Sequence, residues 1–131
     1  MKITTFNPQV ITKDPQSAIA LFEALGFERT HNKTGSGEVE FSSVRMKRRK
    51  DGSDTDSFHI DVVEAKGAPI QSDLMAIRIN VDDFDGAYET LKSRGFQEAE
   101  GFGVTRIVSS KFAFLISPSG FLIDLCQHIK E

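Results

Sequence analysis

Two aspartates interrupt apolar runs in this chain. Asp124 lies in the run 121–126, and Asp61 lies in the similar run 58–63. A carboxylate that is buried without a partner is costly, so each aspartate needs a hydrogen-bond donor, a cation or water. The residue types allow three interpretations, namely a metal ligand, half of a buried ion pair, or the edge of a cavity.

Strand alternation predicts which other side chains accompany these aspartates. Alternate residues of a strand point to the same face, so His59 shares a face with Asp61. The same rule puts Arg78 on the polar face of a strand predicted at 74–82, and two amides on one face of the first strand. The predicted ligand-binding residues are Asn7, Gln9, His59, Asp61, Arg78 and Asp124.

The electrostatic roles within this set stay open at the level of sequence. Arg78 is predicted to pair with Asp124, with Asp61 or with both. Both carboxylates are equally expected to hydrogen-bond backbone or water, since an aspartate acts as a general base only when its pKa is raised. An acidic cleft would suit a cationic ligand, whereas an unpaired Arg78 would suit a carboxylate.

A basic run, Met-Lys-Arg-Arg-Lys, occupies positions 46–50. Asp51 and Gly52 follow it, and Asp-Gly marks a turn. We therefore predict a solvated turn here rather than an anion site.

Helix-capping and turn residues predict how the chain divides into strands and two helices. Asp14 and the proline after it predict the start of a helix that ends at Gly26, and Asp83 and Gly95 enclose a second helix. The predicted strands, the first interrupted by Pro8, span 3–13, 27–32, 38–46, 57–63, 74–82, 96–102, 104–109, 111–116 and 121–127.

The two halves of the chain follow the same pattern. Residues 14–28 align with 83–97 without a gap, and the strands that contain Asp61 and Asp124 also match. Several matches in one register indicate an internal repeat. The sequence predicts one domain, 1–131, made of two βαβββ modules at about 1–68 and about 72–131.

Composition excludes several classes of partner. A net charge of −3 lacks the positive excess that nucleic acid or an anionic membrane surface requires. No apolar stretch approaches the roughly 18 residues of a membrane span. The single cysteine excludes an intrachain disulfide. We expect a cytoplasmic protein without nucleic-acid or membrane partners.

Three motifs resemble the vicinal oxygen chelate superfamily of glyoxalases, bleomycin-resistance proteins, extradiol dioxygenases and fosfomycin-resistance enzymes. They are the run from Asp14 to Phe27, the Val-Asp-Asp-Phe-Asp-x-Ala run at 81–87, and the Ser-Pro-Ser-Gly-Phe-Leu-Ile-Asp-Leu run at 117–125. The resemblance implies an α+β, glyoxalase-like fold in which two βαβββ modules form a cupped mixed sheet around a cleft. It also implies a small organic ligand and a homodimer.

Family enzymes hold a divalent metal with His or Gln and Glu from the first and last strands of each module. Those positions fall here on Asn7, Ala76, Asp61 and Asp124. Alanine is no ligand, and two aspartates with one amide make a poor site for Zn, Ni or Fe(II), which favour imidazole. The resemblance therefore implies a protein that has lost the family's metal site and has no metal cofactor.

Three functions compete on this basis. The first is a small-molecule-binding protein of the glyoxalase and bleomycin-resistance type. The second is a metal-dependent lyase or dioxygenase whose non-standard divalent-metal site combines His59, Asp61, Asp124 and Asn7. The third is an assembly module whose halves pair across a two-fold dimer.

Overall fold

The computed structural model describes residues 1–35, 40–66, 70–99, 103–107 and 109–129. Its two helices are α1 (Pro15–Ala24) and α2 (Phe84–Ser93). Its strands are β1 (Ile3–Thr12), β2 (Glu28–Gly35), β3 (Glu40–Arg49), β4 (Ser57–Lys66), β5 (Leu74–Val81), β6 (Gln97–Glu98), β7 (Thr105–Ile107), β8 (Ser110–Ile116) and β9 (Leu122–His128).

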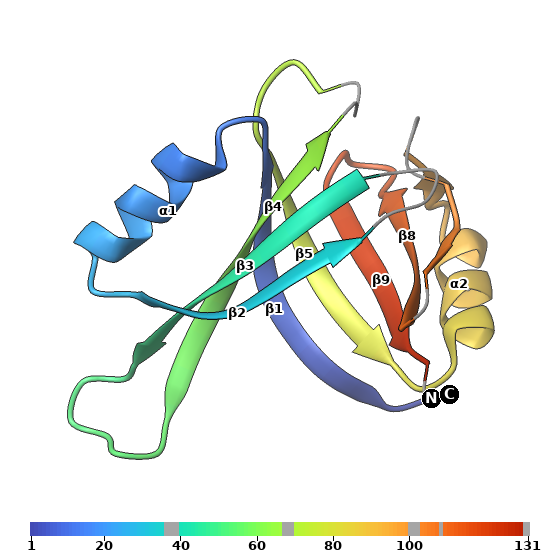
Figure 1. Cartoon of the computed structure of the whole chain (residues 1–131). Helices are drawn as coiled ribbons and strands as arrows, with labels where there is room; N and C mark the ends of the chain where they lie inside the picture. The colour runs from blue at the N-terminus through green and yellow to red at the C-terminus, as the bar shows by residue number, and fades with distance from the viewer. Residues whose placement is uncertain (36–39, 67–69, 100–102, 108, 130–131) are drawn as a thin grey trace.

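All nine strands belong to one mixed sheet. The order is β2-β3-β4-β1-β5-β9-β8-β6, and β7 pairs with β8 outside this path. β1 runs parallel to β4, β5 runs parallel to β9, and β1 and β5 meet as an antiparallel pair in the middle of the sheet. Figure 1 shows the two halves of the sheet bending around a central space, with α1 and α2 outside. The α+β class and cupped mixed sheet are thus confirmed.

Each helix begins at an aspartate and is followed by a glycine. The side chain of Asp14 accepts a hydrogen bond from the Ser17 N–H, and that of Asp83 accepts one from the Gly86 N–H, which satisfies a free donor of the first turn. Gly26 and Gly95 have φ values of +92° and +91°. This left-handed conformation favours glycine, so both residues end their helices where the sequence predicts.

Apolar side chains pack on both faces of the sheet, against the helices on the outer face and against one another on the inner face. On its outer face, Ile60 and Val62 of β4 pack with Ile19 of α1. Ile123 and Leu125 of β9 make the equivalent cluster with α2. On the inner face, opposite the helices, a third cluster joins five strands with one residue from a connection: Ile11, Val63, Ile70, Ala76, Phe112, Phe114, Leu122 and Cys126. The alternation predicted from sequence is therefore confirmed for β4 and β9.

Several strand predictions differ from the structure, and three of the differences concern the course of the chain near the site. Pro8 does not interrupt β1, because the parallel ladder to β4 begins only at Gln9, one residue later. β3 continues through Arg49, so most of the basic run 46–50 is strand rather than turn. Of the strand predicted at 96–102, only Gln97–Glu98 pairs within the described part, and 100–102 lie outside it.

The two halves have related element orders, β-α-β-β-β before residue 67 and β-α-β-β-β-β after residue 70, the extra strand being the three-residue β7. The module boundaries and the internal repeat stay predictions. Among the helices of the described residues, none is long and apolar enough to cross a membrane.

Candidate functional site

An open pocket of about 660 Å³ lies on the inner face of the sheet. Strands of both halves contribute to it, since β2, β3 and β4 supply one side and β5 and β9 the other. Its lining residues, within the described part of the chain, are all polar or charged: Thr30, Ser43, Arg45, Lys47, Ser57, His59, Asp61, Arg78, Ser109 and His128.

Positive charge dominates this pocket. Among the lining residues that the structure describes, Arg45, Lys47 and Arg78 are the cations and Asp61 is the one carboxylate, which leaves a formal excess of two positive charges when both histidines are neutral. Lys47 is exposed and forms no ion pair with another described residue. The sequence left open whether the cleft is acidic or has an unpaired Arg78, and neither alternative took account of Arg45 and Lys47 of β3.

Asp61 is the centre of the hydrogen-bond network. Only 1% of the residue is exposed. Arg45 Nε donates to Oδ1 at 3.0 Å, Arg78 donates to Oδ2 at 3.1 Å, and Asn7 Nδ2 donates to Oδ2 at 3.0 Å. Burial by itself would raise the pKa of Asp61, but the hydrogen bond and charge of Arg45, followed by Arg78 and Asn7, lower that pKa below its usual value. The carboxylate is thus ionised and holds two guanidinium groups in place.

Arg78 occupies the middle of the sheet between the two aspartates. Burial opposes its charge, yet its pKa is raised, because Cys126, Asp124 and Asp61 surround the guanidinium. β5 pairs Arg78 with Asp124 of β9 in the parallel register, whereas among the described residues its ion pair is with Asp61. Of the pairings left open by the sequence, the structure forms the one with Asp61.

Asp124 is buried differently. Gln9 Nε2 donates to Oδ2 at 2.9 Å, and the Cys126 thiol donates to Oδ1 at 3.1 Å. Within the described residues, Asp124 makes no ion pair shorter than 4.0 Å. Burial raises its pKa, and the hydrogen bonds from Gln9 and Cys126 offset this only in part. Burial and the adjacent carboxylate also raise the pKa of the Cys126 thiol well above its usual value.

The amides of β1 support both aspartates without lining the pocket. Asn7 and Gln9 are each 3% exposed. Their amide N–H groups donate to Asp61 and Asp124, respectively, and their buried oxygens find no hydrogen-bond partner within the described part of the chain. Asn7, Gln9 and Asp124 therefore form a layer behind the pocket wall.

His59 lines the pocket and is half-buried. Burial lowers its pKa, and the positive charges of Arg45, Arg78 and Lys47 lower it further, against the opposing effect of Asp61. Its imidazole is therefore neutral near pH 7. The Nε2 atom is buried and has no hydrogen-bond partner among the described residues.

Sequence reasoning missed the contribution of β3 to this site. Ser43, Arg45 and Lys47 alternate along that strand and face the pocket, while Met46 between them is fully buried on the outer side. The period-two pattern was present in the sequence. The predicted strand end at Met46 separated Lys47 from this pattern.

The donor set does not fit a divalent metal. Both oxygens of Asp61 already accept hydrogen bonds, and two guanidinium groups within 3.1 Å of them repel a further cation. At the second predicted position, the oxygens of Asp124 accept from Gln9 and Cys126. Within the described ranges, no three His, Cys, Asp or Glu side chains are grouped so that they would hold a metal ion.

Comparisons with known proteins agree with this architecture. The family model described as Glyoxalase/Bleomycin resistance protein/Dioxygenase superfamily matches residues 3–125. A search of curated protein sequences finds no match.

Several solved structures share the fold. A methylmalonyl-CoA epimerase from Streptomyces coelicolor, in complex with 2-nitronate-propionyl-CoA, is 18% identical with a TM-score of 0.61, over 96% of this chain and 95% of that chain. The methylmalonyl-CoA epimerase from Mycobacterium tuberculosis is 16% identical with a TM-score of 0.59, over 98% and 90%. A superfamily member from Vibrio splendidus is 18% identical with a TM-score of 0.55, over 96% and 99%. At these identities the likeness establishes the fold alone.

Proposed function

The chain belongs to the Glyoxalase/Bleomycin resistance protein/Dioxygenase superfamily, and from this premise we propose that it binds a small organic anion on the inner face of its sheet, without a resident metal. The pocket described above is the binding site. Its residues from both halves of the sheet surround the ligand.

One observation carries the proposal, namely the excess of cationic side chains over carboxylates in the pocket lining. Asp61 is shared between two guanidinium groups, and the Lys47 ammonium has no carboxylate partner among the described residues. An anion entering the pocket supplies the missing countercharge. Electrostatic attraction of this kind weakens with added salt, because the rim residue Lys47 is exposed to screening ions.

The arginines are positioned to bind a planar or tetrahedral anion. Each guanidinium carries five N–H donors. Arg45 uses its Nε and one terminal nitrogen for Asp61, and Arg78 uses one terminal nitrogen for the same carboxylate. Their remaining donors serve carboxylate or phosphate oxygens, for which the guanidinium geometry is well matched. Asp61 thereby positions both arginines, and it does not itself contact the ligand.

The donor chemistry supports binding without a metal. A divalent cation would have to displace Arg45 and Arg78 from Asp61, and it would meet one amide at Asn7 where the family pattern has a stronger ligand. The alternative of a metal-dependent lyase or dioxygenase requires that displacement.

Isothermal titration calorimetry with citrate, inorganic phosphate and, as a cationic probe, spermidine tests the proposal. We expect one of the anions to bind and spermidine to give no heat of binding. Lys47→Ala should weaken anion binding about tenfold, which corresponds to about 1.4 kcal/mol. Lys50→Ala removes an equally exposed lysine outside the pocket lining and should leave the affinity unchanged.

Binding of spermidine but of neither anion would overturn the proposal, and so would equal effects of the two lysine variants. Elemental analysis of the purified protein tests the absence of a resident metal separately. Stoichiometric Zn, Ni, Mn or Fe would contradict that part and favour the metal-dependent alternative.

We also propose that the protein is a cytoplasmic homodimer. An apolar area on the outer face supports the dimer, because Phe6 is 63% exposed and Met75 is 59% exposed on the two central strands, between the areas that the helices cover. Sedimentation equilibrium should give twice the chain mass of 14.5 kDa. A monomer at micromolar concentration would contradict this part alone.

A further inference from the structure

We infer that Ile70 determines which anions the pocket accepts, by filling the apolar half of the inner face and so restricting the ligand to hydrophilic acids without an apolar tail. This inference rests on the proposed function. It adds the ligand's chemical class, hydroxylated or phosphorylated carboxylic acids, and names a residue that sets it.

The inner face has a charged half and an apolar half that adjoin each other. Val63 follows Asp61 by two positions on β4, and Ala76 precedes Arg78 by two positions on β5. A step of two residues is about 7 Å along a strand. Cys126 belongs to the apolar cluster and donates a hydrogen bond to Asp124, so the two halves are in direct contact. A ligand held at Arg78 would thus reach the apolar half within a few carbon atoms.

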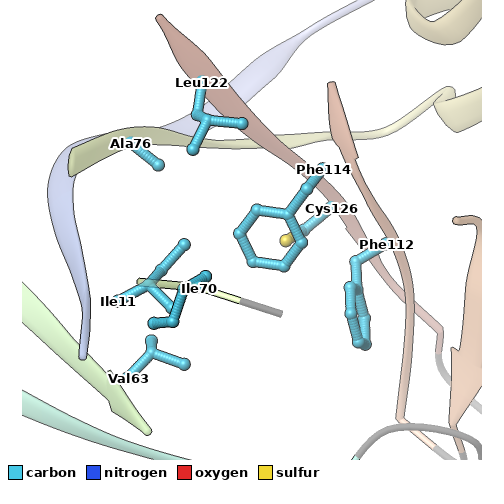
Figure 2. Packing of buried hydrophobic residues seen from close by; sticks show 8 residues of the cluster. All are labelled: Ile11, Val63, Ile70, Ala76, Phe112, Phe114, Leu122 and Cys126. Atoms are coloured by element: carbon cyan, nitrogen blue, oxygen red, sulfur yellow. The ribbon is translucent and has the colours of Figure 1, made fainter. Parts of the chain in front are cut away.

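Ile70 enters this apolar half from outside the sheet. It lies in the connection between β4 and β5, whereas the other seven members of the cluster project from strands. Figure 2 shows its side chain among those of Ile11, Val63 and Phe114, and only 7% of the residue is exposed. One side chain from a connection therefore occupies the space that the strands leave between them.

The filled cluster explains why none of the described residues that line the pocket has an apolar side chain. An apolar tail gains affinity when it leaves water, by roughly fourfold for each buried CH₂ group. With Ile70 in place, the described part of the chain offers such a tail no apolar side chain in the pocket lining beside the arginines. Hydroxyl groups of a ligand instead find Thr30, Ser43 and Ser57 as partners.

The test compares citrate, acetate and octanoate as calorimetric probes of the wild-type protein and of Ile70→Ala. We expect the wild type to bind citrate and to bind octanoate no better than acetate. Ile70→Ala should bind octanoate on the order of tenfold more tightly than the wild type, because the truncated side chain opens space for two to three carbon atoms. Citrate affinity should stay the same.

Ile60→Ala is the matched control. Ile60 is also 7% exposed, but it faces α1 on the outer side, so its truncation should change neither probe. If Ile70→Ala fails to fold, Ile70→Val removes a single CH₂ group and should raise octanoate affinity by roughly fourfold.

The outcomes separate this inference from the proposed function. Wild-type binding of citrate without any gain for octanoate in the Ile70 variants would overturn the role of Ile70 alone. Wild-type binding of octanoate in clear preference to acetate would also overturn it. Failure of the wild type to bind any of these anions, or phosphate, would overturn the proposed function itself.

Discussion

Two aspartates at matching positions, Asp61 of β4 and Asp124 of β9, have pKa values that are shifted in opposite directions. In the first half, the antiparallel neighbour of Asp61 on β3 is Arg45; in the second half, the neighbour of Asp124 on β8 is Phe114. The pKa of Asp61 is lowered and that of Asp124 is raised. The residue opposite each aspartate on the neighbouring strand therefore accompanies the difference: an arginine lowers the pKa of Asp61, whereas burial beside an aromatic ring raises the pKa of Asp124.

The same contrast extends along both neighbouring strands. Ser43 and Lys47 flank Arg45 on the inner face of β3, whereas Phe112 and Ile116 hold the corresponding register positions of β8. One half thus presents charge and hydroxyl groups to the inner face, and the other presents aromatic surface. Cross-strand partners, rather than the aspartates themselves, therefore make the inner face polar along β3 and largely aromatic along β8.

Replacing each aspartate by asparagine should give the largest difference between the halves. Asp61→Asn leaves two partly buried guanidinium groups without an anion and should cost about 3 kcal/mol of unfolding free energy at pH 7. Asp124→Asn keeps an oxygen for the Gln9 N–H and should cost less than about 1 kcal/mol. Urea denaturation of both variants measures the two values. Equal costs would refute the contrast in charge state.

The pH dependence of these variants should have opposite signs. Because its folded pKa is lowered, Asp61 contributes stability that is present above its unfolded pKa of about 3.9 and is lost as the pH falls through the folded pKa. Asp124 has a raised folded pKa, so its contribution is present below about 3.9 and is lost as the pH rises.

Unfolding free energies measured between pH 2.5 and 7 check this prediction. The deficit of Asp61→Asn relative to the wild type should shrink below about pH 4, where the unfolded-state carboxyl is protonated. The loss of unfolding free energy in Asp124→Asn should become smaller as the pH increases above about 4. Parallel curves for the two variants would contradict the prediction of opposite signs.

The glycines after the two helices offer a smaller comparison. A Cβ at Gly26 would meet the Arg48 side chain at 2.9 Å, and a Cβ at Gly95 would meet the ring of Pro118 at 2.9 Å. Both substitutions by alanine place a side chain at positive φ, at a cost of about 1 kcal/mol each. Since a flexible arginine moves more easily than a proline ring, thermal denaturation should show the larger loss for Gly95→Ala. A larger loss for Gly26→Ala would contradict the geometry.

The last comparison concerns Cys126, whose thiol is buried beside Asp124. Cys126→Ala removes the thiol donor to Asp124 Oδ1 but leaves the bond from Gln9, so it should cost about 1 kcal/mol. In the native wild type, the buried thiol with its raised pKa should react with a disulfide reagent only after unfolding. Rapid labelling of the folded protein would show that the second half opens far more readily than its packing implies.

The sequence predicted the fold well because helix caps and strand alternation depend on residues close together in the chain. The capping aspartates, the terminal glycines and the alternation around Asp61 and Asp124 each depend on neighbours within a few positions. The inner-face assignment of His59 and Arg78 followed from the same rule, and both line the pocket.

The rest of the site depended on pairings between distant strands. Arg45 reaches Asp61 only because β3 and β4 pair in one particular register, and a one-residue slip would turn Arg45 outward. Gln9 meets Asp124 across a separation of 115 residues, which no local pattern reports. Ile70 lies in a connection, where strand alternation makes no prediction.

Hydrogen bonds across the centre of the sheet also affect the order in which polar contacts can form during translation. Gln9 of β1 donates to Asp124 of β9, while Arg78 of β5 donates to Asp61 of β4, so each half completes the polar interior of the other. During synthesis, β1 emerges first but its glutamine has no acceptor until the last strand leaves the ribosome. The first half can therefore form the Arg45–Asp61 and Asn7–Asp61 contacts by itself, whereas Gln9 lacks its acceptor until β9 has been synthesised and paired.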